Sequence, residues 1–183
     1  QELLNSVYSG PFVTLGKAEF SNSKNSNVQK WSAYIHGAVN RQDYWERALE
    51  WVSKDKVNIG DYMSKHRYKN DISEVESYFN AVIDWVSDTF PEIEDEMCGL
   101  EWGRLYETYL SRKIDKEKIR GQVSVLYSDG YVKNRKGIWE YVLGGCKETN
   151  LLEIRVFDES TKKPQYTSQT NEAKKNNGSN CPL

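Results

Sequence analysis

Apolar side chains recur at helical spacing in the middle of the chain. Between residues 75 and 86 they are three or four positions apart, which places them on one face of a helix: Val75, Tyr78, Phe79, Val82, Ile83 and Val86. Asp71 with Glu74, or Ser73 with Glu76, has the spacing of a capping box ahead of that face. The pattern predicts a long amphipathic helix that forms one side of a core.

Shorter helices are predicted on both sides of it. One begins near Asn40, a residue type that caps helix N-termini, and has apolar residues over 44–52. Others are indicated after Pro91, from about Asp115, and over residues 135–143, where a Gly-Gly pair provides the usual stop. These segments together predict a helical bundle.

Two segments depart from helical periodicity. Residues 9–31 are rich in Ser, Asn, Gly and Lys, and we expect an irregular segment with one short helix at most. In residues 151–157, LLEIRVF, apolar and charged residues alternate, which predicts a strand. After the turn DESTKKP, Pro164 suits the first position of a last, polar helix.

The predicted fold is mainly α with a small α+β part. Residues 1–39 form an irregular lead-in and residues 40–110 a helical domain. The order helix, helix, short helix and strand over residues 97–160 is compatible with a winged-helix-like unit, and residues 111–160 would then belong to the same domain or to a second one. Residues 161–183 follow as a terminal segment. Any small α+β domain would show the same order, so the winged-helix interpretation remains one of two alternatives.

Composition refines this picture in three respects. Six Trp and twelve Tyr in 183 residues are many, so aromatic rings should dominate the core. No apolar run approaches the roughly 20 residues that span a bilayer. Three widely spaced cysteines argue against a disulfide framework and favour a reducing cytoplasm. We therefore expect a cytoplasmic protein without a membrane partner.

Charge is divided unevenly between the two halves. Residues 1–109 contain 11 Lys and Arg against 18 Asp and Glu, whereas residues 110–183 contain 14 against 9. The second half is the one that could face a polyanion. Its candidate contacts with DNA phosphates are Lys133, Arg135, Lys136, Arg155, Lys162 and Lys163. The alternative is that these side chains are simply solvated.

The other reactive side chains do not form a recognisable catalytic pattern. The acidic residues between Glu92 and Glu96 suit a solvated helix start better than a metal site, which requires a folded cluster. His36 and His66 are expected at surface or core positions, and Cys98 and Cys146 as structural thiols. We predict no catalytic residue in this chain.

Several segments, in order, resemble one family: YSGPFVTLGKAEFS, NRQDYWERALEWVS, IGDYMSKHR, GLEWGRLYETY, VKNRKGIWEYVLGG, LLEIRVFDESTKKPQYTSQT and SNCPL. They are similar to the region that follows a ParB/sulfiredoxin-like N-terminal domain in bacterial proteins that often end in an HNH nuclease. Those proteins are related to the GmrSD-type modification-dependent restriction systems. The resemblance covers nearly the whole chain.

The resemblance implies a non-catalytic central region that links a sensor to a nuclease. The lead-in to the HNH module, R-x-F…K…Y…Q…C-x-x-C, matches Arg155, Phe157, Lys163, Tyr166, Gln169 and Cys181, with its second cysteine expected just after Leu183. Cys181 would thus be one thiolate of an incomplete zinc site. Zinc and a divalent metal are implied for the HNH module, and no cofactor for this region.

The implied partners are DNA, through residues 110–183, and the N-terminal and HNH domains of the same protein. The region itself is not expected to cut DNA, whereas the parent protein would be an HNH endonuclease. One alternative is a scaffold or protein-interaction domain that binds no DNA. An independent small-molecule enzyme would require a pocket with convergent ionisable groups.

Overall fold

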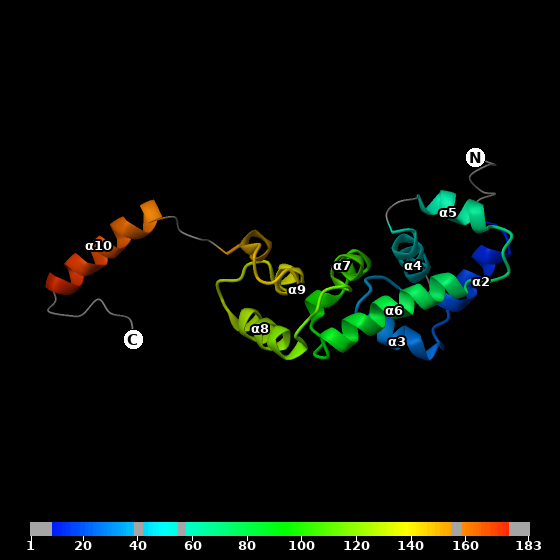
Figure 1. Ribbon diagram of the computed structural model, residues 1–183, viewed down its shortest axis with the longest axis horizontal. Helices are drawn as coiled ribbons and strands as arrows, with labels where there is room; N and C mark the ends of the chain where they lie inside the picture. The colour runs from blue at the N-terminus through cyan, green and yellow to red at the C-terminus, as the bar shows by residue number, and fades with distance from the viewer. Residues whose placement is uncertain (1–8, 39–41, 55–57, 155–158, 176–183) are drawn as a thin grey trace.

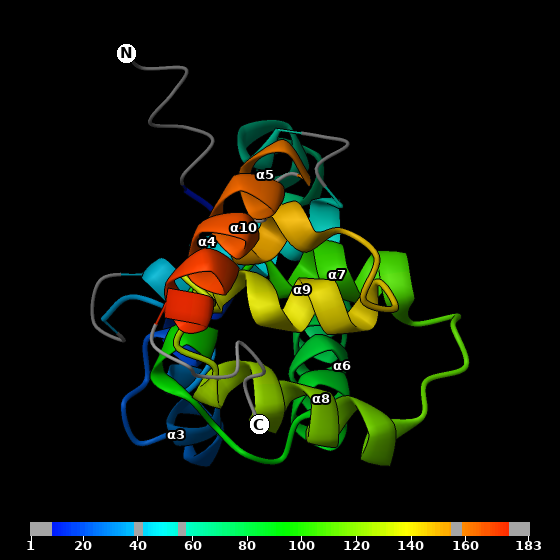
Figure 2. The same cartoon turned by 90° about the vertical axis from the view of Figure 1, so that its left-hand side faces the viewer.

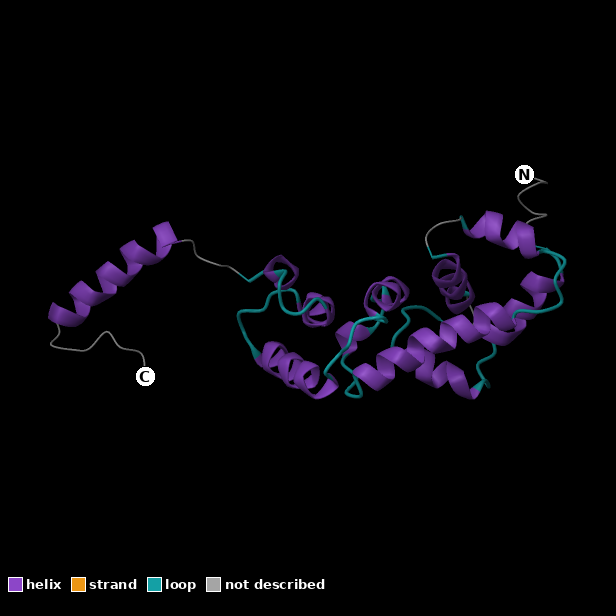
Figure 3. Cartoon of the chain, viewed as in Figure 1, coloured by secondary structure: helices purple, strands orange, loops and turns teal. Residues whose placement is uncertain are grey.

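The computed structural model describes residues 9–38, 42–54, 58–154 and 159–175, with side chains described through residue 154 and again from residue 166. All regular elements in these ranges are helices, which confirms the mainly α prediction (Figures 1 and 3). The α-helices are α2 (Pro11–Phe20), α3 (Ser26–Ser32), α4 (Asp43–Ser53), α5 (Ile59–His66), α6 (Ser73–Thr89), α7 (Trp102–Tyr109), α8 (Lys116–Ser128), α9 (Ile138–Leu143) and α10 (Glu159–Lys175). Short 3-10 helices are η2 (Asp95–Met97), η3 (Arg135–Gly137) and η4 (Thr149–Leu152).

Helix α6 is the long amphipathic helix that the sequence predicts. Five residues of its apolar face are fully buried, namely Val75, Phe79, Val82, Ile83 and Val86, and Tyr78 is partly buried. The helix begins at Ser73, whose N–H donates to Asp71 Oδ1 at 2.9 Å. The predicted capping box does not form, because Asp71 closes the preceding turn instead.

The prediction of an irregular segment at residues 9–31 is wrong. This stretch forms α2 and α3, which bury Phe12, Phe20 and Trp31 in the core. Gly16 misled the sequence interpretation, because glycine is usually a breaker. In α2 it allows close packing: a Cβ there would lie 2.4 Å from Cη2 of Trp45.

Aromatic rings dominate the core of this half, as the composition predicts. Phe79 of α6 lies with its ring centroid 5.1 Å from that of Trp31, 5.3 Å from that of Phe20 and 4.9 Å from that of Trp51. Phe20 and Trp31 in turn stack at 5.1 Å. Four helices, α2, α3, α4 and α6, therefore meet around one aromatic cluster.

The predicted strand at 151–157 is wrong over the residues that the structure describes. Leu152 ends the 3-10 helix η4, and Glu153 adopts a left-handed conformation with φ 49°. The Leu152 carbonyl accepts hydrogen bonds from the N–H groups of Lys133 and Asn134, both at 3.1 Å. Residue 152 is buried because η4 packs on η3 and α9, so its apolar character reflects a buried turn and not a pleat.

No wing is seen for the winged-helix-like unit among the described residues. A wing requires strands, and residues 111–154 contain only α8, η3, α9 and η4. The rest of the predicted strand, including Arg155, lies outside the described residues. The helical part of the prediction is confirmed: α8 is capped by Asp115, whose Oδ1 accepts from the Lys118 N–H at 3.1 Å.

Polar bridges join α8 and α9 to the rest of the molecule. Arg104 of α7 makes a two-pronged contact with Glu140 of α9, with N···O distances of 2.8 and 2.6 Å. The Tyr127 hydroxyl of α8 donates to Glu96 at 2.7 Å. Buried Trp139 belongs to the same core cluster as Trp102 of α7, so the two halves also share apolar packing.

The polar C-terminal helix is confirmed as α10, although it begins at Glu159, ahead of Pro164. Figure 1 shows it at one end of the molecule, apart from α8 and α9. In Figure 2, which looks along the molecule from that end, α10 lies in front of the other helices. Tyr166 in this helix is 65% exposed, as expected for a helix with no apolar face.

Candidate functional site

The structure places Lys133, Arg135 and Lys136 together on the surface around η3, and all three are exposed. Arg135 is also drawn toward an acidic residue: its Nη1 lies 3.9 Å from Glu96 Oε1, and its guanidinium carbon 4.8 Å from the centroid of the Tyr127 ring. Of these three cations, Arg135 and Lys136 both lie near the Glu96 carboxylate.

Glu96 is held in its ionised form by these neighbours. Its pKa lies below the usual range, first because the Tyr127 hydroxyl donates to it and then because Arg135 and Lys136 lie close. The same hydrogen bond raises the pKa of Tyr127 to about 12. Glu96 belongs to the acidic run 92–96, so this run helps to attach α8 and η3 to the rest of the molecule through Tyr127 and Arg135.

The remaining predicted contacts cannot be located on the surface. Arg155 and Cys181 lie outside the described residues. Lys162 and Lys163 lie within α10, but the structure does not describe their side chains. The predicted roles of these four residues remain predictions.

A different set of cations converges on one hollow of about 320 Å³ between the start of α8 and the end of α9. Its basic lining residues are Arg112, Lys113, Lys118 and Lys147, and we call it the basic hollow. Asp115 is the only carboxylate among the lining residues, and one of its oxygens caps the helix. Within the described part of the chain, none of the four cations forms an ion pair.

Local backbone geometry brings these cations together. Arg112 follows α7, its N–H donates to the Tyr109 carbonyl at 3.0 Å, and its guanidinium carbon lies 4.8 Å from the Tyr109 ring centroid. After α9, Gly145 and Cys146 both have positive φ, 78° and 60°. This left-handed pair turns the chain so that Lys147 lines the hollow.

The other cations of α8 are already paired. Lys116 forms an ion pair with Asp88 of α6, and Arg120 contacts Glu117 at 2.9 Å and the Asp88 carbonyl at 3.2 Å. These residues attach α8 to α6. Helix α8 therefore uses one set of cations for attachment and presents Lys118 to the basic hollow.

The charge imbalance of the sequence points to the half that contains the hollow but does not identify these four residues. Arg112 and Lys147 are 35 positions apart, so no local motif joins them. The only signal was the charge imbalance of residues 110–183, which does not single out positions.

The two histidines occupy one core position and one surface position. His66 is buried, with Nδ1 2.8 Å from the Tyr62 carbonyl oxygen, and His36 is exposed. Cys98 and Cys146 are free and half-buried. Among the residues that the structure describes, no three His, Cys, Asp or Glu side chains are arranged to hold a metal ion.

Comparisons of the chain with protein-family models, with curated proteins and with solved structures found no match. The resemblance to HNH-containing restriction proteins therefore stands on the sequence segments alone. In the described ranges, no helix has both the length and the apolar character that crossing a bilayer requires.

Proposed function

We propose that this chain is the non-catalytic central region of an HNH-type DNA restriction endonuclease, and that it contacts the DNA backbone through the basic hollow. In this proposal it works in the cytoplasm and connects a sensor module to the nuclease module. The single observation that carries the DNA contact is the convergence of Arg112, Lys113, Lys118 and Lys147, all without ion pairs in the described structure.

The chemistry of the hollow suits phosphate and not base edges. Lysine and arginine bind phosphate oxygens and release counterions, a contribution that does not depend on base sequence. The Tyr109 ring orients the Arg112 guanidinium, so less side-chain freedom is lost when it binds. Lys133, Arg135 and Lys136 extend the same basic half, with a weaker role because Glu96 opposes two of them.

The metals that the resemblance implies do not enter this proposal. The described residues offer no ligand set for zinc or for a divalent ion. Cys181, the one expected ligand, lies outside the described residues. In this proposal, as the resemblance implies, DNA is cut by the HNH module.

Binding to a labelled DNA duplex of about 20 base pairs, measured by fluorescence anisotropy across a salt series, tests the proposal. The variant Lys113→Glu/Lys118→Glu/Lys147→Glu should bind at least about tenfold more weakly than the parent chain at about 50 mM salt, with a shallower salt dependence. The matched control reverses three exposed lysines of the first half, Lys24, Lys65 and Lys69, and changes the net charge equally.

Equal weakening by both triple variants would show a general charge effect and contradict a site at the hollow. Absence of binding by the parent chain at low salt would favour the alternative, a scaffold or protein-interaction domain that binds no DNA.

A further inference from the structure

The lining of the basic hollow is not made of charged groups alone. Apolar side chains from the start of α8, the segment before it and the end of α9 lie among the cations, namely Ile114, Ile119, Val142 and Leu143. Three of them are at most 7% exposed, whereas Ile114 is only partly buried. The hollow therefore has an apolar floor, and Ile114 is the part of it that offers most surface to a bound group.

Charged and apolar groups are neighbours in this lining. Lys113 directly precedes Ile114, and Lys118 directly precedes Ile119. Because all four line one hollow, a ligand with an anionic end and an apolar face can contact both kinds of group at once. The volume of about 320 Å³ suits a group of the size of one nucleotide.

Arg112 adds a second surface for such a ligand. Its guanidinium carbon lies 4.8 Å from the Tyr109 ring centroid, and the Arg112 side chain is exposed. Nucleobases stack on guanidinium planes as well as on aromatic rings. The face of the guanidinium that points away from Tyr109 can therefore support a base.

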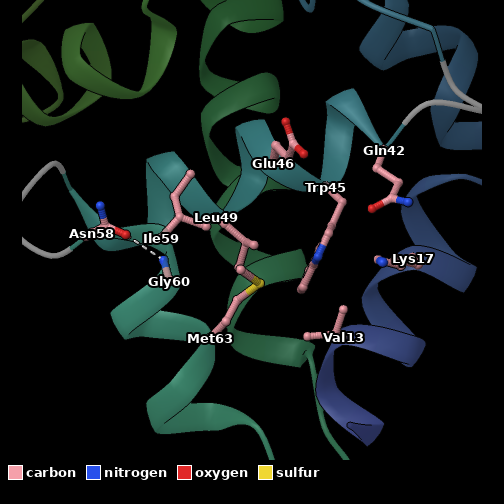
Figure 4. Close-up of a pocket in the computed structure, with 10 residues that line it drawn as sticks. All are labelled: Val13, Lys17, Gln42, Trp45, Glu46, Leu49, Asn58, Ile59, Gly60 and Met63. Atoms are coloured by element: carbon pink, nitrogen blue, oxygen red, sulfur yellow. Dashed lines mark hydrogen bonds between the residues drawn. The ribbon is translucent and has the colours of Figure 1, made fainter. Parts of the chain in front are cut away.

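A hollow of equal volume between α2, α4 and α5 lacks this combination (Figure 4). Figure 4 shows Lys17 on one side of the Trp45 ring, and Leu49 and Met63 on the other. The lining also contains Glu46, which balances the charge of Lys17. Charge and apolar surface are thus separated there, whereas in the basic hollow they adjoin.

The apolar floor distinguishes an unpaired strand from a duplex. In duplex DNA the bases are stacked inside the helix, and a protein meets phosphates, sugars and base edges. In an unpaired strand the faces of the bases are exposed and pack on protein side chains beside a basic groove. An apolar floor among phosphate-binding cations therefore matches an unpaired nucleotide.

We propose that the basic hollow holds one unpaired nucleotide of a DNA strand. The lysines pair with its phosphate, and the base lies against Ile114 and the outer face of the Arg112 guanidinium. This inference rests on the proposed function, since it requires DNA contact at the hollow, and it adds the form of DNA that the hollow takes.

Two strands with the same phosphates test the proposal on the whole chain. One is a labelled thymidine strand of about 20 nucleotides, and the other is a strand of the same length whose sugars carry no bases. Fluorescence anisotropy at about 50 mM salt should show about tenfold tighter binding of the thymidine strand, because it alone offers a base to the floor. This ratio should stay constant across a salt series, since both strands release the same counterions.

Substitution of the floor separates the base from the phosphates. Ile114→Ala should weaken binding of the thymidine strand about fivefold and leave binding of the base-free strand and of the duplex unchanged, whereas Ile114→Val should retain most of the preference. Leu110→Ala is the matched control, because Leu110 is 51% exposed directly after α7 and does not line the hollow. Thermal unfolding of each variant verifies that the fold is retained.

Equal binding of the two strands by the parent chain would overturn the inference, and this comparison requires no variant. A preference for the thymidine strand that Ile114→Ala leaves intact would also overturn it.

The triple lysine variant separates this inference from the proposed function. If that variant binds the duplex more weakly while the parent chain binds both strands equally, DNA contact at the hollow stands and the unpaired nucleotide is excluded. If the triple variant binds the duplex as tightly as the parent chain does, both proposals fail.

Discussion

The half formed by α2–α6 and the half formed by α8 and α9 are stabilised in different ways. In the first, rings from four helices meet around Phe79, which is fully buried. In the second, α8 buries only Ile119, and Val125 on the same helix is 71% exposed. The second half joins the same core through α9, which buries Ile138, Trp139, Val142 and Leu143, and polar bridges such as Arg104–Glu140 add to this contact. The first half is thus centred on an aromatic cluster, whereas in the second half α9 supplies the apolar contact and α8 stays largely exposed.

The largest effect is expected in the aromatic core. Phe79→Ala removes a ring that contacts three others and leaves a cavity, so the free energy of unfolding should fall by about 3–5 kcal/mol. Chemical denaturation measures it. Tyr131→Ala, at a position 80% exposed in the second half, is the control and should change stability by less than about 0.5 kcal/mol. Similar losses in both variants would contradict the comparison.

An intermediate effect is expected where η3 meets η4. A Cβ at residue 137 would lie 1.9 Å from the Leu151 carbonyl oxygen, which already accepts a hydrogen bond from the side-chain amide of Asn134 at 3.0 Å. Gly137→Ala should therefore force the two turns apart and destabilise the protein by about 1–3 kcal/mol. Hydrogen exchange should become faster at the backbone N–H groups of Lys133 and Asn134, which donate to the Leu152 carbonyl. Unchanged protection there would show that the turns are not tightly packed.

The matching substitution in α8 should have the opposite sign. Apart from its chain neighbours and the backbone of its own helix, no atom of the described residues lies within 4 Å of a Cβ built at residue 121, in the interior of α8. Gly121→Ala should raise the free energy of unfolding by about 0.5–1 kcal/mol, because alanine loses less backbone freedom than glycine in a helix. Thermal melts of Gly121→Ala and Gly137→Ala should shift the melting temperature in opposite directions from that of the parent chain. A lower free energy of unfolding would mean that a side chain at residue 121 collides with a neighbour, which contradicts the open space around this position.

The smallest effect concerns the bridge between the halves. The Arg104 hydrogen bonds hold the pKa of Glu140 below its usual range. A carboxyl with a depressed folded pKa contributes stability above its unfolded pKa, and this contribution is lost as pH falls through the folded value. The pair is partly exposed, at 48% and 26%, so its contribution should be about 0.5–1 kcal/mol.

Denaturation at neutral pH and at a pH below the usual glutamate range checks this contribution. Glu140→Gln should remove part of the acid-induced loss of stability. Thr108→Val, on the exposed face of α7, should keep the full loss. If both variants show the same acid dependence as the parent chain, the bridge does not contribute.

The sequence predicted elements best where burial is periodic. Helix α6 was predicted from its apolar face, because every third or fourth side chain meets the same core. Helix α2 was missed, because Gly16 resembles a breaker unless its neighbour Trp45 is known. The strand predicted over residues 151–157 does not form at residues 151–154, because buried Leu152 in a turn produces the same alternation as a pleat.

The candidate sites were predictable only in outline. The charge imbalance indicated the basic half, but the hollow depends on a left-handed turn at Gly145 and Cys146 that brings Lys147 close to Arg112.

The contact between Gly16 and Trp45 has a consequence for comparing relatives of this protein. The indole can lie deep only because residue 16 has no side chain behind it. An alanine at that position would collide with the ring and separate α2 from α4. The identity of residue 16, on the face of α2 that packs against α4, should therefore distinguish relatives that keep this close helix packing from those that have lost it.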